Sequence, residues 1–534
     1  MPELSTADHA CAPPRVTTPR DYNAAYDLIE RNLRAGRANR TAFIDDHGSY
    51  SYADVDRRSS AFANVLRSLG IAPEQRILLC LHDTVDFPVA FLGAIKAGVI
   101  PVAVNTLLTQ ADYEYMLADS RARLAVVSSP LAPLFQPLQG KVPTLQTILV
   151  SGEATGGDSL ALRMAQAPTT FAVASTTCDD ACFWLYSSGS TGVPKGTVHT
   201  HSSLILTAEL YARPFLRIGE DDVGFSAAKL FFAYGLGNGL TFPMAVGATS
   251  VLMAERPTPD AVFARLRKHR PTIFYGVPTL YASMLAHPKL PGRDELRLRC
   301  CTSAGEALPE DIGKRWSRHF GVDILDGIGS TEMLHIFLSN RAGDVTYGTT
   351  GKPVPGYEVR LVDPEGAPTP HGEAGELQVR GPTAAACYWN NRAKTRDTFI
   401  GAWTRTGDKY LLDADGHYVY AGRSDDMLKV SGIYVSPIEV ESALITHEAV
   451  LEAAVVGKQD GDHLVKPIAF VVLKPECTPS PAVAEQLKRH VKARLAPYKY
   501  PRWIEFVPEL PKTATGKIQR FKLRAQVAAG RDGS

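Results

Sequence analysis

The chain has 534 residues, of which 45% are hydrophobic and 21% are charged, and its formal net charge is +1. That length exceeds what one hydrophobic core supports, so we expect several subdomains. A near-zero charge without a long basic run argues against nucleic-acid binding. The eight scattered cysteines are expected to be reduced core thiols of a cytoplasmic protein rather than disulfides or zinc ligands. The N-terminus lacks a basic stretch followed by an apolar core, so we expect no secretory signal.

Apolar and amphipathic segments alternate from residue 76 onward. Helices are predicted over 86–98 and 111–119. Strands are predicted at 76–82, 99–105, 122–129, 272–280, 296–306 and 322–332. Strands that alternate with helices imply βαβ units and a parallel sheet flanked by helices, so the predicted fold class is α/β.

Residues 230–254 carry no charge over a length that could cross a bilayer. The segment nevertheless contains several glycines and Pro243, which punctuate local structure. We therefore predict a short helix, a turn and a strand within a buried core, and no membrane partner.

The pattern of polar and apolar residues changes near Gly351. Polar and apolar residues then alternate around Gly/Pro turns, which predicts an antiparallel or barrel-like β piece. A compact α+β pattern follows, with helices at 436–447 and 482–495 and strands at 450–458 and 466–474. We predict a large N-terminal domain over 1–424 and a small C-terminal domain over 425–534.

The stretch "YSSGSTGVPKG" (186–196) follows an apolar strand. Glycine lets backbone N–H groups turn inward as an anion nest, hydroxyls add donors, and Lys195 supplies charge. The spacing differs from a Walker A loop. A flexible turn is the alternative, but five small or hydroxyl residues in a row before Gly192 favour a phosphate-binding loop.

This stretch resembles the phosphate loop of the acyl-adenylate-forming superfamily, and other matching motifs follow in order. In "GIGSTE" (327–332) the resemblance implies that Thr331 contacts the α-phosphate and Glu332 holds Mg²⁺. "TRTGD" ends at Asp408, which would bind ribose, and "PKTATGKIQR" contains Lys517, which would be the mobile catalytic lysine. The resemblance covers about residues 25 to 525.

The resemblance implies a full set of nucleotide contacts and a pivoting small domain. Lys517, Thr331 and Glu332 would be catalytic, and the hinge would lie at Asp425. ATP, Mg²⁺ and coenzyme A are the implied cofactor and substrates, and the loop Lys429–Gly432, including Ser431, would receive the pantetheine arm. The implied ATP or AMP contacts are Ser187, Ser188, Gly189, Ser190, Thr191, Gly192, Lys195, Ser303, Ala304, Gly305, Glu306, Asp326, Gly327, Ile328, Asp408 and Arg423.

Within the superfamily, "LFFAYGLGN" and "GIGSTEMLHIFLSN" look most like benzoate-CoA ligases. Phe232 stands where many acyl-CoA synthetases have His, and Ile328 where many have an aromatic residue. The candidate acid pocket consists of Trp184, Phe232, Ala233, Tyr234, Tyr275, Ala304, Gly327, Ile328 and His335. Aromatic walls with a small floor suit a flat ring. Core packing is the alternative for Trp184, Tyr275 and His335.

Several alternatives stay open. Singly, Asp408 reads as a turn residue, Arg423 with Asp425 as a surface pair, and Lys517 as an exposed loop lysine. Rival functions are amino-acid adenylation feeding a carrier protein, a hydroxybenzoate or aminobenzoate-CoA ligase, and a non-catalytic nucleotide-binding protein. The pocket region shows no carboxylate for a substrate ammonium, and we expect no carrier domain after residue 534. We expect small-molecule partners, with a homodimer and lysine acylation near Lys512 or Lys517 left open.

Overall fold

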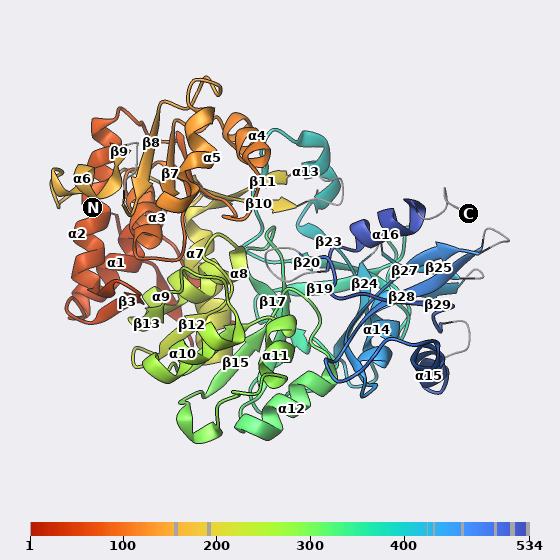
Figure 1. Cartoon of the computed structure of the whole chain (residues 1–534). Coiled ribbons are helices and arrows are strands. Elements are labelled where there is room, and N and C mark those ends of the chain that lie inside the picture. The colour runs from red at the N-terminus through yellow and green to blue at the C-terminus, as the bar shows by residue number, and fades with distance from the viewer. Residues whose placement is uncertain are drawn as a thin grey trace.

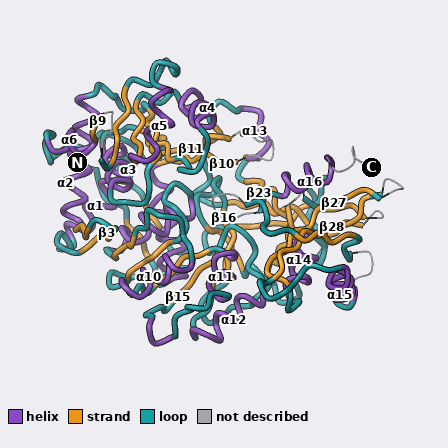
Figure 2. The backbone as a smooth tube through the Cα atoms, viewed as in Figure 1, coloured by secondary structure: helices purple, strands orange, loops and turns teal. Residues whose placement is uncertain are grey.

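The structure is a computed structural model that describes residues 2–153, 158–188, 194–423, 426–430, 433–460, 464–495, 499–512 and 518–529. Figure 1 shows one large body that contains the elements from α1 to β17, with the blue elements α14 to α16 at its side. Figure 2 shows strands inside both parts and helices around them. The predicted α/β class is confirmed.

The first sheet contains the predicted βαβ units. Its order in the described residues is β21-β11-β10-β6-β5-β7-β8-β9. From β10 to β9 neighbouring strands are parallel, whereas β10–β11 and β11–β21 are antiparallel. The strands are β5 (Arg76–Cys80), β6 (Ile100–Ala103), β7 (Leu124–Ser128), β8 (Thr147–Ser151), β9 (Asp158–Ser159), β10 (Ala181–Ser188), β11 (Pro194–Thr200) and β21 (Cys387–Tyr388), and the crossover helices are α3 (Asp86–Lys96) and α4 (Gln110–Ser120).

The second sheet has the order β18-β17-β16-β15-β14-β12-β13-β3-β4 in the part of the chain that is described. The predicted strand at 272–280 ends earlier, at Gly276, because Pro278 starts helix α11 (Pro278–Leu285) in the position that proline favours. The strands are β3 (Thr41–Asp45), β4 (Gly48–Ser51), β12 (Val223–Ser226), β13 (Thr249–Val251), β14 (Ile273–Gly276), β15 (Cys300–Ser303), β16 (Ile324–Gly329), β17 (Ile336–Ser339) and β18 (Lys352–Pro353).

The main core joins the two sheets. Leu79 of β5, Leu185 of β10 and Tyr275 of β14 belong to one buried cluster, which also includes helices α1 (Ala24–Arg34) and α2 (Tyr52–Ser68). Alternate strand residues point outward into two separate clusters under the outer helices. This alternation is expected for strands that are buried on both faces.

The uncharged segment 230–254 differs from the predicted helix, turn and strand. α8 (Ala233–Leu236), the π-helix η4 (Gly237–Thr241) and α9 (Phe242–Val246) follow one another directly before β13. The turn was wrong because the glycines serve close packing: a Cβ at Gly235 would lie 2.0 Å from the Lys229 carbonyl oxygen. In the described part of the chain, none of the helices has both the length and the apolar composition that a membrane crossing demands.

The region after Gly351 forms the predicted antiparallel sheet. β19 (Glu358–Val362), β20 (Gly375–Arg380), β23 (Trp403–Leu412) and β22 (Phe399–Ile400) pair in that order, and β24 (Tyr418–Arg423) pairs with β23. β24 ends directly before residues 424–425.

The C-terminal part has its own hydrophobic core. Leu428, Val455 and Leu487 belong to one buried cluster and Ile468 and Leu523 to another, both made only from residues beyond 427. The predicted helices and strands are confirmed, and a third strand of the same sheet, a separate pair of short strands and a last helix join them. The elements are β25 (Leu428–Val430), β26 (Ile433–Val435), α14 (Pro437–Ile445), β27 (Val450–Gln459), β28 (Val465–Leu473), α15 (Pro481–Lys492), β29 (Trp503–Phe506) and α16 (Arg520–Ala529). The boundary at 424/425 remains a prediction.

Candidate functional site

The predicted phosphate loop connects two antiparallel strands. In β10 and β11, Ser187 lies opposite Lys195 and Ser188 opposite Pro194. The hairpin therefore holds the residues on both sides of the loop at one end of the first sheet. The predicted contacts Gly189, Ser190, Thr191 and Gly192 and the Ser188 side chain lie outside the described residues.

The Glu332 carboxylate joins three distant parts of the chain. Its Oε1 accepts hydrogen bonds from Ser187 Oγ at 3.3 Å and from the Tyr388 hydroxyl at 2.7 Å. Lys195 Nζ lies 4.6 Å from the centre of the Tyr388 ring, a cation–π distance. Burial lowers the pKa of Lys195, and the Glu332 charge opposes that shift. The hairpin, the "GSTE" segment and β21 thus meet at one carboxylate.

Thr331 is fixed through its backbone. His199 Nε2 donates a hydrogen bond to the Thr331 carbonyl oxygen at 2.7 Å, and burial lowers the pKa of His199 to about 4. His199 is therefore neutral at pH 7 and acts as a fixed donor. Leu334, three residues further on, has φ +67°, a left-handed conformation that is uncommon for leucine. The side chains of Thr331 and Glu332 remain partly exposed.

The "SAGE" and "DGI" segments lie side by side at the ends of neighbouring parallel strands. Ser303 pairs with Asp326 in the register of β15 and β16. Burial raises the pKa of Asp326 well above its usual value. Ser303 Oγ and Asp326 Oδ1 are buried and have no hydrogen-bond partner among the described residues. Gly305 has φ +97°, so the chain turns sharply there. Ends of parallel strands are the usual position of a ligand site in an open sheet.

Asp408 and Arg423 face each other across β23 and β24. Arg423 Nη1 donates to Asp408 Oδ1 at 3.2 Å. The side chain of Asp408 is 13% exposed and that of Arg423 is 42% exposed, so the pair opens to solvent on the arginine side. Asp408, the predicted ribose contact, and Arg423, another predicted ATP or AMP contact, are therefore brought together.

Most of the predicted acid pocket gathers against the main core. Phe232, Ala233, Tyr234 and Ile328 are partly buried and pack on that core, next to the buried Ala304 and Gly327. The Tyr234 hydroxyl is hydrogen-bonded to Thr302 Oγ1. These residues come from α8 and the residue before it, from the residue after β15 and from β16, and they combine aromatic rings with small side chains.

His335 and Tyr275 lie deeper in the same region. His335 is 3% exposed, and its Nε2 donates to the Tyr234 carbonyl oxygen at 3.3 Å. Burial lowers the pKa of His335 to about 3, so the ring is neutral at pH 7. His335 Nδ1 and the Tyr275 hydroxyl are buried without a hydrogen-bond partner in the described part of the chain.

Trp184 is not brought to this group. It points to the outer face of β10, into a different core cluster from Phe232 and Tyr275, and its ring lies 4.7 Å from the Trp389 ring. Phe183 and Leu185, its neighbours in the strand, point into the main core instead. The placement of Trp184 supports core packing, the alternative to a pocket role, because side chains alternate along a strand.

A hydrogen bond far along the chain links the small C-terminal part with the "SAGE" segment. Glu306 Oε1 accepts from the Ile518 backbone N–H at 3.1 Å. Lys517, Asp425, Ser431 and Gly432 lie outside the described residues, as does the side chain of Lys429, whose backbone pairs with Tyr434. Lys512 Nζ lies 2.5 Å from Glu452 Oε1. The residue after Lys517 thus lies beside the "SAGE" segment.

Tyr388 and His199 are site residues that sequence reasoning missed. Tyr388 is 56 positions from Glu332 and belongs to no recognised motif, so only the pairing of β21 with β11 reveals it. His199 follows the phosphate loop closely in "GTVHTH", and this proximity in the sequence could have identified it as a candidate site residue.

Comparisons with known proteins agree with this geometry. Residues 29–389 match the AMP-binding enzyme family, and residues 439–517 match the AMP-binding enzyme C-terminal domain. A benzoate–CoA ligase of Thauera aromatica is 68% identical over 98% of this chain and 100% of its own length. A crystal structure of a benzoate CoA ligase from Burkholderia xenovorans LB400 is 59% identical, with a TM-score of 0.90 over 94% of this chain and 100% of that one.

A further solved structure contains an adenylate. The anthranilate CoA ligase AuaEII, crystallised in complex with anthranoyl-AMP, is 47% identical, with a TM-score of 0.92 over 96% of this chain and 99% of that one. The matched family covers well over half of the sequence, and the relatives cover almost all of it. The chain belongs to the AMP-binding enzyme family.

Proposed function

We propose that this chain is an ATP-dependent aryl-CoA ligase that activates benzoate. The acid is first joined to AMP with release of pyrophosphate, and the acyl group then passes to coenzyme A. The observation that carries the proposal is the convergence of Ser187, Tyr388 and Lys195 around Glu332, with His335 and its aromatic pocket three residues further along. The names of the benzoate-CoA ligases and the bound anthranoyl-AMP of the third relative support the same reaction class.

We assign the nucleotide contacts to the hairpin and to the two strand ends. We assign the phosphates to the loop 187–192 with Lys195 and Thr331, and the ribose to Asp408 and Arg423. The segments 303–306 and 326–328 are assigned to the adenosine side. Backbone donors and a lysine offset the repulsion between the carboxylate substrate and the polyphosphate.

Mg²⁺ fits the donors that surround Glu332. This ion prefers hard oxygen ligands and is commonly held by one or two carboxylates together with substrate phosphates. The two hydroxyl groups that bind Glu332 are neutral, so they orient the carboxylate without cancelling its charge. Glu332 would hold the ion, which would neutralise phosphate charge when bound. Lys195 remains near enough to the carboxylate to interact with it electrostatically.

The two half-reactions need different partners at one site. In the first, a benzoate oxygen attacks the α-phosphorus and pyrophosphate leaves with the electron pair of the broken P–O bond. In the second, the CoA sulfur attacks the adenylate carbonyl and AMP leaves. We assign Lys517 to the first step and the loop Lys429–Gly432, with Ser431, to the second. Asp425 is assigned as the hinge between domains 1–424 and 425–534.

Benzoate should be the best acid or close to it. A pyrophosphate-release assay with benzoate, hydroxy- and aminobenzoates, long-chain fatty acids and amino acids tests this directly. One added or missing group in such a pocket changes specificity by only ~10–200-fold, so small ring-substituted benzoates should react more weakly. A higher kcat/KM for a fatty acid or an amino acid would contradict the proposal.

The amino-acid alternative has less support. Asp326, a buried carboxyl beside Gly327 of the predicted pocket, has its pKa raised by burial, so it is a poor partner for a substrate ammonium. We further infer a cytoplasmic enzyme with small-molecule partners.

Ala233→Leu should raise the KM for benzoate by about 10-fold or more, because the larger side chain would occupy space that the ring needs. The KM for ATP should stay unchanged, which makes it the internal control. Steady-state kinetics with each substrate varied in turn measures both values. Unchanged benzoate kinetics in a folded variant would remove Ala233 from the pocket.

A further inference from the structure

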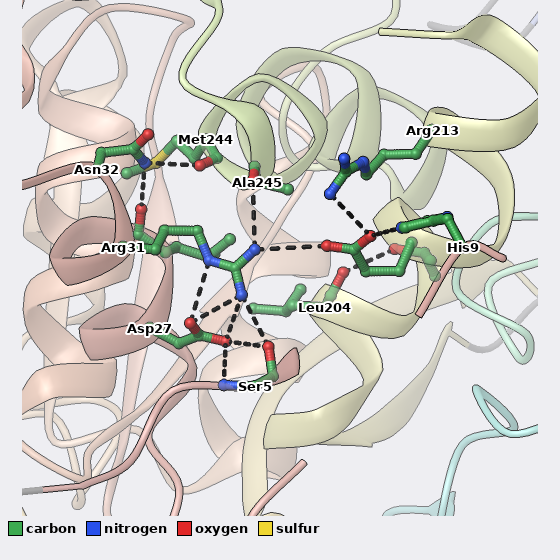
Figure 3. Close-up of polar contacts among 12 residues, drawn as sticks. Ser5, His9, Asp27, Arg31, Asn32, Leu204, Arg213, Met244 and Ala245 are labelled. Carbon is green, nitrogen blue, oxygen red and sulfur yellow. Dashed lines mark hydrogen bonds and ion pairs between the residues drawn. The ribbon is translucent and has the colours of Figure 1, made fainter. Parts of the chain in front are cut away.

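The N-terminal segment folds back onto the first helix through buried polar groups. Ser5 Oγ donates to Asp27 Oδ2 at 2.5 Å and accepts from Arg31 Nη2 at 2.7 Å. Tyr22 OH also donates to Asp27, at 2.7 Å. The Asp27 side chain is fully buried, and Figure 3 shows Arg31 extended between it and the helices that follow. A charge removed from water is retained only when it is paired and hydrogen-bonded, as Asp27 is here.

A second buried carboxylate lies on the other side of Arg31. Glu209 belongs to the π-helix η3 (Ala208–Leu216), and its side chain is 3% exposed. It lies 2.7 Å from His9 Nε2, 3.4 Å from Arg31 Nη1 and 3.5 Å from Arg213 Nη1. Arg31 therefore connects the Asp27 carboxylate of α1 with the Glu209 carboxylate of η3.

Arg31 also contacts the C-terminal end of α9. Arg31 Nη1 donates to the Ala245 carbonyl oxygen at 3.2 Å, and the neighbouring Asn32 Nδ2 donates to the Met244 carbonyl oxygen at 2.7 Å. Both acceptors belong to α9, which follows η4 directly. α1 thus fixes η3 and α9 together (Figure 3).

Both of these helices carry a ring that contacts His335 of the acid pocket. The Tyr211 ring of η3 lies 5.5 Å from the His335 ring, and the Phe242 ring of α9 lies 4.5 Å from it, centre to centre. His335 also lies so near Gly237 that a Cβ there would be 2.4 Å from its Cδ2. Any rotation of η3 or α9 would therefore shift His335 and the Tyr234 carbonyl that it binds.

The conformation of η3 needs support from outside the helix. A π-helix is rare, because its wider turn packs less well than an α-helix, and it is found mostly at functional sites. Returning to α-helical hydrogen bonding would rotate Tyr211 relative to Glu209. Two of the three contacts of the Glu209 carboxylate, those with His9 and with Arg31 of α1, oppose this rotation because they fix the start of the π-helix from outside.

We propose that the Glu209–Arg31–Asp27 network positions the acid pocket, and that the N-terminal segment acts through it as an outer support. The proposal rests on the proposed aryl-CoA ligase function. Glu209 and Arg31 touch no reacting atom and act through Tyr211, Phe242 and His335. They set the affinity and selectivity for the ring of the acid, and they leave ATP binding unaffected.

The test compares KM values in the full-length protein. Glu209→Gln keeps the size of the side chain and removes its charge, and it should lower kcat/KM for benzoate by about 10- to 100-fold, the effect of a small misplacement remote from the chemistry. The loss should appear in the KM for benzoate, while the KM for ATP stays unchanged, and the preference for benzoate over 4-substituted benzoates should narrow. Glu209→Asp, which keeps the charge, should recover part of the loss.

A matched control lies elsewhere in the large body. Lys96 is 3% exposed on its side chain and pairs with Asp56 at 2.6 Å, between α2 and α3. Asp56→Asn should lower the melting temperature without changing the KM for benzoate. Where Glu209→Gln does not fold, His9→Ala serves instead, because it removes only the outer contact, and it should raise the benzoate KM in the same direction.

Two failures are distinguishable. No benzoyl-CoA from the wild-type protein would overturn the proposed function. If the wild-type protein forms benzoyl-CoA, two results would overturn the positioning role. One is a KM for benzoate in Glu209→Gln and His9→Ala that equals the wild-type value. The other is an equal change in the KM for benzoate and the KM for ATP.

Discussion

Lys517→Ala is expected to reduce the formation of benzoyl-adenylate and pyrophosphate by ~10²–10³-fold, the usual effect of removing a donor that stabilises charge on a reacting group. The lysine would bridge the benzoate carboxylate and the ATP phosphates while charge redistributes between them. Supplied with synthetic benzoyl-adenylate and CoA, the same variant should make thioester at a near-normal rate. Pyrophosphate release measures the first half-reaction, and consumption of the free thiol measures the second.

Gly432→Leu is the complementary control, because a side chain there would obstruct the pantetheine arm and slow only thioester formation. Asp425→Pro, which fixes φ near about −65°, should impair the exchange between the two steps. The hydrogen bond from the Ile518 N–H to Glu306 is consistent with Lys517 being presented for the first step. Equal slowing of both half-reactions in Lys517→Ala would point to a shared structural role and contradict the pivoting account.

Glu332→Gln is expected to lower the rate of adenylation by a similar factor, ~10²–10³-fold. The amide keeps an oxygen that can accept from Ser187 and Tyr388, so the fold around it should persist while the charge that would hold Mg²⁺ is lost. The Mg²⁺ concentration for half-maximal pyrophosphate release should rise. Titration of Mg²⁺ at saturating ATP measures this shift.

Tyr388→Phe provides the comparison for Glu332→Gln. It removes one hydrogen bond to the carboxylate but keeps the aromatic ring beside Lys195, so its effect on the Mg²⁺ requirement should be smaller. A Glu332→Gln variant with an unchanged Mg²⁺ requirement would assign the metal to other residues.

Local patterns in the sequence predicted much of the fold. The alternation over residues 76–129 gave the parallel strands β5, β6 and β7 with their crossover helices, because each segment expresses one period clearly. The segment 230–254 was harder to interpret. Its glycines read as helix breakers, yet they allow close approach to Lys229 and His335, which is a property of the packed structure.

Some residues of the candidate site could be predicted from motifs, and others could not. Motif order brought Ser187, Lys195 and Glu332 to attention, and the structure places them together. Trp184 was predicted as an aromatic pocket residue, with core packing as the alternative. A strand sends alternate side chains to opposite faces, and the face could not be predicted from residue type. The contact of Tyr388 with Glu332 depends on a strand pairing between distant segments, which no local signal specifies.

The Asp408–Arg423 pair would connect nucleotide binding with the orientation of the small domain. Arg423 ends β24, the last strand before the proposed hinge, and its partner Asp408 is the proposed ribose ligand. A nucleotide whose ribose replaced Arg423 as the partner of Asp408 would change the relative free energies of the conformations that the hinge residues after Arg423 can adopt. Thermodynamic reciprocity then requires each domain orientation to change nucleotide affinity by the same factor. Rotation of the small domain would therefore change the affinity for AMP. The equilibrium between the domain orientations would then govern both the release of AMP and the start of the next cycle.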